Sequence, residues 1–207
     1  MIRPPGVDGV AFTEAGDGDQ RLDPTSHAAV SDALGLPHEW ASIRQIHGNV
    51  VHRAHKSGEV GEGDGVWSTV SGLPLVVFTA DCYGVVLRAP GAVGVAHAGW
   101  RGAGAGLLTR LRTEMAQAGH TPTHAAVGPG IGPCCFEVGE EVATKFYDFR
   151  AVTSWGTNSV DLVASLTAEL SGLEIWGADS CTLHQPGWFS YRRDQTSERL
   201  ATVGWLP

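Results

Sequence analysis

The chain has 207 residues and a mass of 21.8 kDa, which suffices for one domain with a substantial core. Charged residues make up only 17% of the chain, while glycine and proline occur 28 and 11 times, a composition that excludes a coiled coil. The net charge of −8 argues against a nucleic-acid partner bound by a broad basic face. No apolar run has membrane-spanning length and no signal peptide is visible, so we expect a cytoplasmic protein without a membrane partner. The cysteines form no disulfide framework, and we expect a single domain over residues 1–207.

The first half of the chain predicts one short helix followed by strands. The helix is expected at residues 27–34 and ends at Gly35. Residues 42–47 and 50–53 are predicted to form a strand pair joined by the turn dipeptide Gly48-Asn49, and residues 56–65 to form a loop. Further strands are predicted over residues 75–79, 85–88 and 93–97. The first and third of these are almost continuously apolar, as in strands buried on both faces.

The second half predicts three helices among short strands. A helix is expected over residues 102–118, because Leu107, Leu108, Leu111 and Met115 share one face. Two more are expected near residues 136–149 and 160–170, with Ser159 as the N-cap of the second. Strands are expected at residues 125–127, 174–177 and 200–205. Strands and helices mix without strict alternation, which predicts one α+β domain with a mixed sheet.

Three residues that can bind a metal stand at the ends of apolar strands: His47, Cys82 and His97. Two imidazoles and one thiolate form a donor set that zinc favours, and three protein ligands leave a fourth position for water. The spacing of positions 47, 82 and 97 matches no zinc finger. The spacing alone therefore favours the alternative, in which Cys82 is a buried apolar residue and the two histidines are core residues with satisfied hydrogen bonds.

Glycine-rich junctions at residues 97–104 and 127–135 are typical of turns that expose backbone N–H groups to anions. Arg101 lies in the first junction and offers a fork that grips phosphate or carboxylate. The second junction is interpreted mainly as structural, and neither matches a known nucleotide-binding fingerprint. Near the C-terminus, Arg192 and Arg193 precede Asp194, so that one arginine can reach a pocket while the other pairs with the aspartate. Taken alone, this segment favours the alternative of a surface ion pair.

These segments together resemble the multicopper polyphenol oxidase, or laccase-domain, family, whose members are also described as purine nucleoside phosphorylases and as peptidoglycan editing factors. The matching stretches include QIHGNVV, TADC, HAGWRG, IGPCC and FSYRRD, and they extend from about residue 42 to the end of the chain. The first 40 residues match poorly, and Gly84 stands where members usually carry proline.

The resemblance implies a four-layer α/β/β/α fold and a zinc ion held by His47, Cys82 and His97. It implies phosphorolysis of adenosine, inosine and methylthioadenosine together with deamination of adenosine, so the expected partners are a purine nucleoside and phosphate. On this basis we expect Arg101 to bind phosphate, with Arg44 and Arg192 as weaker candidates. Asp81, beside Cys82, is expected to orient a metal ligand or to act as a base.

Three other functions stay open. Copper-dependent oxidation of phenols is less favoured, because a multicopper enzyme needs several histidine-rich centres and the chain offers one tripod. The second is hydrolysis of an amide bond in cell-wall precursors, with Cys82 as the nucleophile and His97 as its base. The third is a redox or metal-binding protein without turnover.

Overall fold

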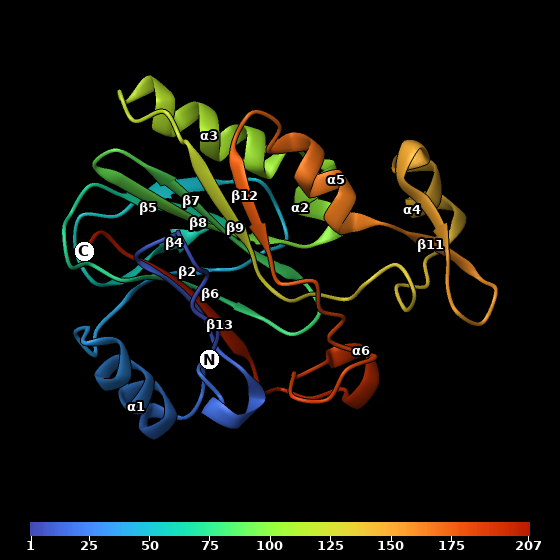
Figure 1. The fold of residues 1–207 in the computed structure, drawn as a ribbon, viewed down its shortest axis with the longest axis horizontal. Coiled ribbons are helices and arrows are strands. Elements are labelled where there is room, and N and C mark those ends of the chain that lie inside the picture. The colour runs from blue at the N-terminus through green and yellow to red at the C-terminus, as the bar shows by residue number, and fades with distance from the viewer.

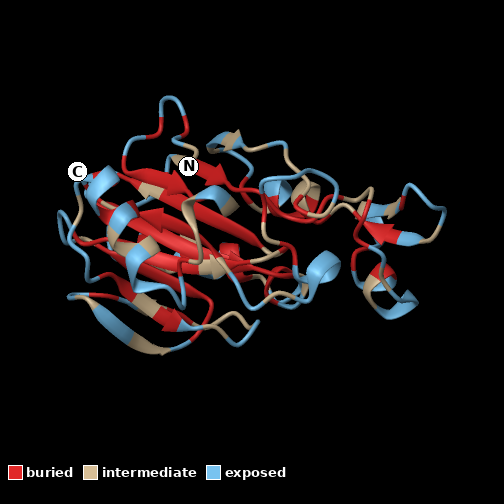
Figure 2. Cartoon of the chain, turned by 90° about the horizontal axis from the view of Figure 1, so that it is seen from below, coloured by how far each residue is buried: buried red, intermediate tan, exposed pale blue.

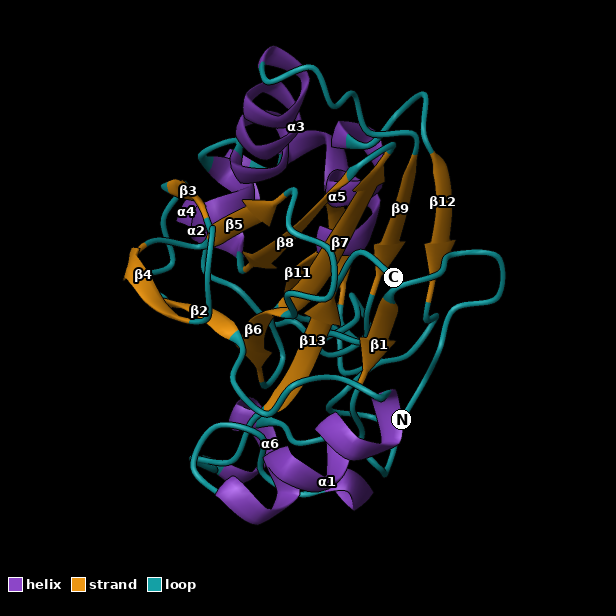
Figure 3. Cartoon of the chain, turned by 90° about the vertical axis from the view of Figure 1, so that its left-hand side faces the viewer, coloured by secondary structure: helices purple, strands orange, loops and turns teal.

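The computed structural model describes residues 1–207. Two β-sheets lie face to face and helices cover the outer face of each, so the layers follow in the order α/β/β/α (Figure 1). Figure 3 shows the strands between α3 on one side and α1 on the other. The expected four-layer fold with mixed sheets is confirmed.

The larger sheet has six strands in the order β12-β9-β7-β8-β5-β3. Their bounds are β3 Val51–Arg53, β5 Gly65–Ser68, β7 Tyr83–Ala89, β8 Ala92–Ala98, β9 His124–Val127 and β12 Glu174–Gly177. The central strands β7 and β8 pair antiparallel, from Tyr83 opposite Ala98 to Ala89 opposite Ala92. Every residue of β8 is buried, because helices cover one face of the strand and the second sheet covers the other.

The second sheet has five strands in the order β1-β13-β6-β2-β4. Their bounds are β1 Val10–Phe12, β2 Ala41–Arg44, β4 Gly58–Glu62, β6 Leu75–Thr79 and β13 Leu200–Gly204. Apolar side chains of the two sheets pack together, among them Val77 and Val86. Figure 2 shows the strands at the centre of the molecule mostly in red, the colour of buried residues. A separate two-stranded pair, β10 Arg150–Val152 and β11 Asn158–Val160, projects from one side of the layers (Figure 1).

The helices are α1 Pro24–Leu34, α2 Trp100–Gly104, α3 Leu107–Gln117, α4 Glu140–Lys145, α5 Leu162–Glu169 and α6 Tyr191–Asp194. The apolar face of α3 packs on the six-stranded sheet beside α5, and α1 covers the other sheet. Asp23 caps the start of α1 by accepting a hydrogen bond from the N–H of Thr25. Gly35 ends the helix in the left-handed region at φ 67°. No helix has both the length and the apolar character needed to cross a membrane.

The predicted strand pair at residues 42–53 is wrong. β2 and β3 belong to different sheets, because the N–H groups at positions 46–48 bond to the side chain of Asp64 instead of closing a hairpin. The predicted loop at residues 56–65 contains β4, which pairs parallel with β2 at the edge of its sheet.

Two predicted helices also differ from the structure. The helix expected over residues 102–118 is divided into α2 and α3 at Gly106, whose φ of 73° a helix cannot continue. The one expected over residues 136–149 is reduced to α4 and a turn of 3-10 helix at Tyr147–Phe149. The N-cap of α5 is Asp161, which accepts from the N–H of Ala164, while Ser159 lies in β11.

Candidate active site

Three crossovers of the chain from one sheet to the other meet at one place. The chain passes from the five-stranded to the six-stranded sheet between β2 and β3, between β4 and β5, and between β6 and β7. These crossovers carry His47, Asp64 and Cys82, respectively. His97, near the end of β8, donates its backbone N–H to the carbonyl of Asp64 at 2.7 Å. The topology therefore collects groups that are far apart in the sequence.

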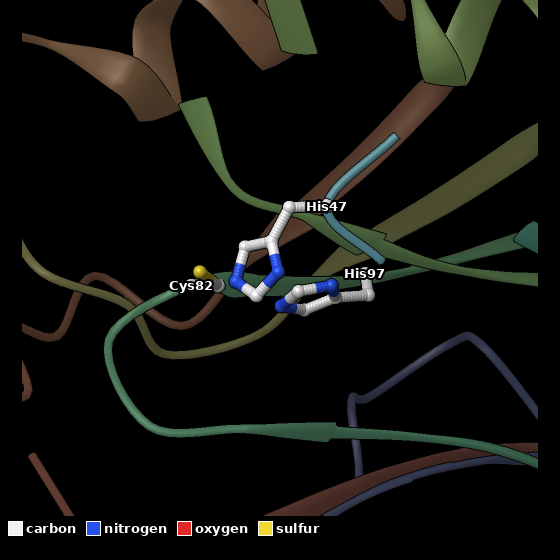
Figure 4. Close-up of side chains that lie close together, drawn as sticks. All are labelled: His47, Cys82 and His97. Carbon is white, nitrogen blue, oxygen red and sulfur yellow. The ribbon is translucent and has the colours of Figure 1, made fainter. Parts of the chain in front are cut away.

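His47, Cys82 and His97 form a tripod (Figure 4). One ligand atom from each residue lies within 4.8 Å of the other two. The two imidazole rings meet edge to face, with their centroids 4.8 Å apart. His97 is buried, Cys82 is half-buried and His47 is exposed, so the tripod opens to solvent on one side. The structure thus brings together the three residues that the sequence analysis named, and their role as metal ligands stays a prediction.

Asp64, which the sequence reasoning did not identify, organises the tripod. Its fully buried carboxylate accepts N–H hydrogen bonds from Ile46, His47 and Gly48 at 3.2, 3.0 and 2.6 Å. The same carboxylate lies 2.8 Å from Nδ1 of His97. With Nδ1 engaged, Nε2 is the nitrogen of His97 that is available to a metal. The only available signal was the acidic residue in the stretch EGDGVW, which has no recognisable spacing to the ligands.

Two residues of the site have left-handed backbone conformations that side chains rarely adopt. The φ angle is 60° at His47 and 89° at Asp81. Asp64 holds the first through the backbone N–H of His47. Asp81 is held because its carboxylate accepts from the Thr182 hydroxyl and the Arg192 N–H, both at 2.7 Å. Such strain persists only where surrounding contacts impose it, and it is concentrated at functional sites.

The structure thus places Asp81 differently from Asp64. Both carboxylate oxygens of Asp81 accept hydrogen bonds from the segment at residues 182–192, and neither bonds to His47 or His97. The carboxylate that contacts a tripod histidine is therefore that of Asp64, and the role of Asp81 as a base stays a prediction.

Gly99 leaves the space in which the tripod side chains meet. A Cβ atom added at this position would lie 2.9 Å from Sγ of Cys82 and 3.4 Å from Cδ2 of His47. Any side chain here would push against two members of the tripod. Gly84, the site of the missing proline, lies within β7, and a Cβ there would overlap the Thr202 hydroxyl.

The electrostatics of the tripod favour a charged pair. Burial alone would raise the pKa of the Cys82 thiol, but His97 and His47 lower it to about 6. Burial alone would lower the pKa of His97, but Cys82 and Asp64 raise it to about 9. In the metal-free chain at neutral pH, Cys82 is thus a thiolate beside an imidazolium.

The tripod opens into a cavity of about 710 Å³ that is rich in arginine. Arg44, Arg101 and Arg192, the predicted anion-binding residues, all line it. Arg21 and Arg199 line it as well and were missed, because no local sequence pattern distinguishes either of them from an ordinary surface arginine. Five of the 14 basic residues of an acidic chain therefore surround one cavity.

Arg101 differs from the other four arginines of the cavity. Its guanidinium stacks on the Trp100 ring, 4.3 Å from the centroid, and donates no hydrogen bond within the chain. Arg44 pairs with Glu62 at 3.2 Å, and Arg192 donates to the Glu137 carbonyl at 3.1 Å. Arg21 and Arg199 donate to backbone carbonyls. Arg101 thus keeps all its N–H donors available to an anion.

The donor set and its surroundings fit a metal ion. Two imidazoles and a thiolate suit zinc, and Asp64 fixes His97 as carboxylates commonly fix metal-binding histidines. The structure therefore defines a class of protein with two facing sheets and a candidate metal centre where the chain crosses between them.

Comparison with known proteins identifies the family. A sequence model of the family described as multi-copper polyphenol oxidoreductase laccase matches residues 13–207, so the chain belongs to this family. A purine nucleoside phosphorylase of Deinococcus radiodurans is 35% identical over 201 residues, covering 90% of this chain and 78% of that protein. The purine nucleoside phosphorylase YfiH of Escherichia coli is 34% identical over 189 residues, with coverages of 84% and 76%.

The fold is shared with solved structures. The crystal structure of the hypothetical protein YfiH of Bacillus licheniformis has a TM-score of 0.86 to this chain at 22% identity. The match covers 96% of this chain and 92% of that one. This likeness shows that the whole layered architecture is shared with that structure.

Proposed function

We propose that the protein is a zinc-dependent purine nucleoside phosphorylase that also deaminates adenosine. The observation that carries the proposal is the meeting of a His-Cys-His tripod and five arginines in one cavity. The names of the relatives support the reaction class. The arginines of the cavity fit it as well, because phosphorolysis needs an anion-binding group beside the nucleoside. Adenosine, inosine and methylthioadenosine are the proposed nucleosides, and phosphate is the co-substrate.

Each residue has a proposed task. His47, Cys82 and His97 would hold the metal, which supplies Lewis acidity that lowers the pKa of a water molecule toward neutrality. Arg101 binds phosphate through its unpaired guanidinium, and Arg44 and Arg192 add positive charge to the same cavity. Asp64 holds His97 in orientation. Asp81 is a positioning residue: it directly precedes Cys82, and its carboxylate accepts a hydrogen bond from the backbone N–H of Arg192.

Zinc is favoured over copper because the surroundings of the tripod do not offer the axial ligand of a blue-copper site. A His₂Cys set also occurs in blue-copper sites, where an axial methionine or glutamine completes the coordination. The chain has only Met1 and Met115, and neither lines the cavity. Met115 lies on the buried face of α3, in the core. Gln45 lines it, but its side-chain amide donates to the Phe78 carbonyl and accepts from the Phe78 N–H, both at 2.8 Å. The remaining position is thus open to water or substrate, as in catalytic zinc sites.

The test is a panel of the three nucleosides with and without phosphate, using protein whose metal content has been measured. We expect the free base and a phosphorylated sugar only when phosphate is present. Adenosine should also yield inosine without phosphate. Absence of base release from protein that carries one zinc per chain would contradict the phosphorylase proposal, and absence of inosine would contradict only the deaminase part.

A second candidate function rests on the Cys82–His97 charge pair. A thiolate beside an imidazolium is the arrangement of cysteine hydrolases, so hydrolysis of an amide in cell-wall precursors is the alternative. His47→Ala separates the two proposals. A nucleophilic Cys82 needs only His97 and keeps most of its activity in this variant, whereas a metal tripod loses metal and activity together.

A further inference from the structure

A second cluster of potential metal ligands lies outside the tripod. The sulfur atoms of Cys134, Cys135 and Cys181 all lie within 4.8 Å of one another, and the first two are 3.3 Å apart. All three residues are free thiols. Neither phosphorolysis nor deamination uses them, because they lie outside the arginine-rich cavity.

The backbone holds the three sulfurs together. Gly132 donates its N–H to Sγ of Cys181 at 3.2 Å, and its carbonyl accepts from the N–H of Cys135 at 3.0 Å. Ser154 holds Cys134 by donating both its N–H and its hydroxyl to the Cys134 carbonyl, at 2.8 and 3.1 Å. A Cβ at Gly132 would contact the sulfurs of Cys134 and Cys181 at 3.5 Å, so the glycine leaves them uncovered. The thiols are therefore brought together by hydrogen bonds of neighbouring segments, without a disulfide.

An ion can reach this cluster from solvent. Cys134 and Cys181 are half-exposed and line a second cavity of about 470 Å³, while Cys135 is buried behind them. Tyr83 lines this second cavity and its neighbour Cys82 lines the first, so the two cavities adjoin the same end of β7. All three cysteines pack in or against the apolar core, but core packing alone does not require three sulfur atoms to lie within 4.8 Å of one another.

We propose that Cys134, Cys135 and Cys181 bind one thiophilic metal ion, copper(I) or zinc(II), through their three sulfur atoms. Thiolate sulfur selects these two ions over magnesium, calcium and manganese, which prefer oxygen. Each thiol that becomes a ligand releases its proton to solvent as the sulfur–metal bond forms. The oxidation state of the ion does not change.

The test uses Cys82→Ser, which removes the sulfur of the tripod, and compares it with Cys82→Ser/Cys134→Ser/Cys181→Ser. Both reduced proteins are titrated without oxygen with copper(I) or with zinc(II), each in competition with a coloured chelator. We expect the single variant to bind one more equivalent of ion than the triple variant, with an ultraviolet sulfur-to-metal band if the ion is copper. The arm that shows the extra equivalent identifies the ion. Equal binding by the two variants in both arms would overturn the proposal.

A second measurement leaves the cluster intact and does not depend on the folding of the triple variant. Cys82→Ser is alkylated with iodoacetamide, with and without each ion, and the modified cysteines are identified by mass spectrometry. Ligation should slow alkylation of Cys134 and Cys181 by about tenfold or more, because a metal-bound thiolate is a poor nucleophile. Unchanged alkylation rates with both ions would likewise overturn the proposal.

Discussion

His97 and Asp64 are joined twice. The backbone N–H of His97 donates to the carbonyl of Asp64 at 2.7 Å, and its Nδ1 lies 2.8 Å from the Asp64 carboxylate. Burial alone would raise the pKa of Asp64, but His97 and the N–H groups of Gly48 and His47 hold it below its usual value. The carboxylate is thus ionised and fixed before any ligand arrives.

Asp64→Asn is expected to weaken zinc binding by about 10- to 100-fold, as losses of carboxylates behind metal-binding histidines typically do. The amide is uncharged and no longer fixes the tautomer of His97. Zinc affinity is measured by competition with a chelator. Asp32→Asn is the matched control, because Asp32 also bonds to a histidine, the exposed His38. Equal zinc affinity in the two variants would show that Asp64 does not act on the tripod.

Gly99→Ala is expected to lower zinc content and activity together, because the new Cβ would stand 2.9 Å from the sulfur of Cys82. Gly139→Ala is a close control. Both glycines are N-caps with nearly the same backbone, φ −80° and ψ 169° against φ −74° and ψ 166°. Nothing lies within 4 Å of a Cβ at Gly139. A Gly99→Ala protein with full zinc content would refute the steric argument.

Alkylation of Cys82 in the metal-stripped protein is expected to follow a pH midpoint near 6, since only the thiolate reacts. The rate should be high above this pH and fall below it as the thiol is protonated. His97→Gln removes the imidazolium and should move the midpoint upward, toward or beyond the ordinary thiol value of about 8.5. Rates of Cys82 modification are followed by mass spectrometry, and zinc should protect the residue. A wild-type midpoint near 8.5 would contradict the charge pair.

Arg101→Ala is expected to raise the KM for phosphate by roughly 10- to 100-fold, the equivalent of losing one charged hydrogen bond. Zinc content should not change, because the Arg101 guanidinium stacks on Trp100 and makes no hydrogen bond to a tripod residue. Arg110→Ala is the control, since Arg110 is an exposed arginine that pairs with Glu114 on α3. The measurement is initial rate against phosphate concentration. If phosphate dependence is the same in both variants, Arg101 does not bind the anion.

The sequence was informative where its local pattern matched the tertiary environment. The apolar runs of β6 and β8 predicted buried strands. Cys82 and His97 at the ends of these runs, together with His47 beyond β2, suggested the tripod once the family motifs were considered. Donor chemistry is encoded in residue type, so the ligand set could be proposed before the geometry was known.

Other features depend on long-range contacts that no local pattern carries. β2 and β3 look like a hairpin, yet Asp64, from another crossover, takes the N–H groups of the turn. β5 was not predicted, because its four buried residues, Gly65–Ser68, include both a glycine and a serine. The clustering of Arg21 and Arg199 with Arg101 likewise follows from the packing of segments remote in sequence.

The crossovers have a consequence for folding thermodynamics. His47 and Cys82 lie where the chain leaves the five-stranded sheet, and His97 belongs to the six-stranded one, so an ion bound by all three links the two layers. The unfolded chain cannot assemble these ligands, and binding therefore stabilises only the native state. At free zinc 1,000 times above Kd, this linkage adds about 4 kcal/mol to the free energy of unfolding. The melting temperature should accordingly rise with zinc concentration, and a chelator should loosen the contact between the sheets.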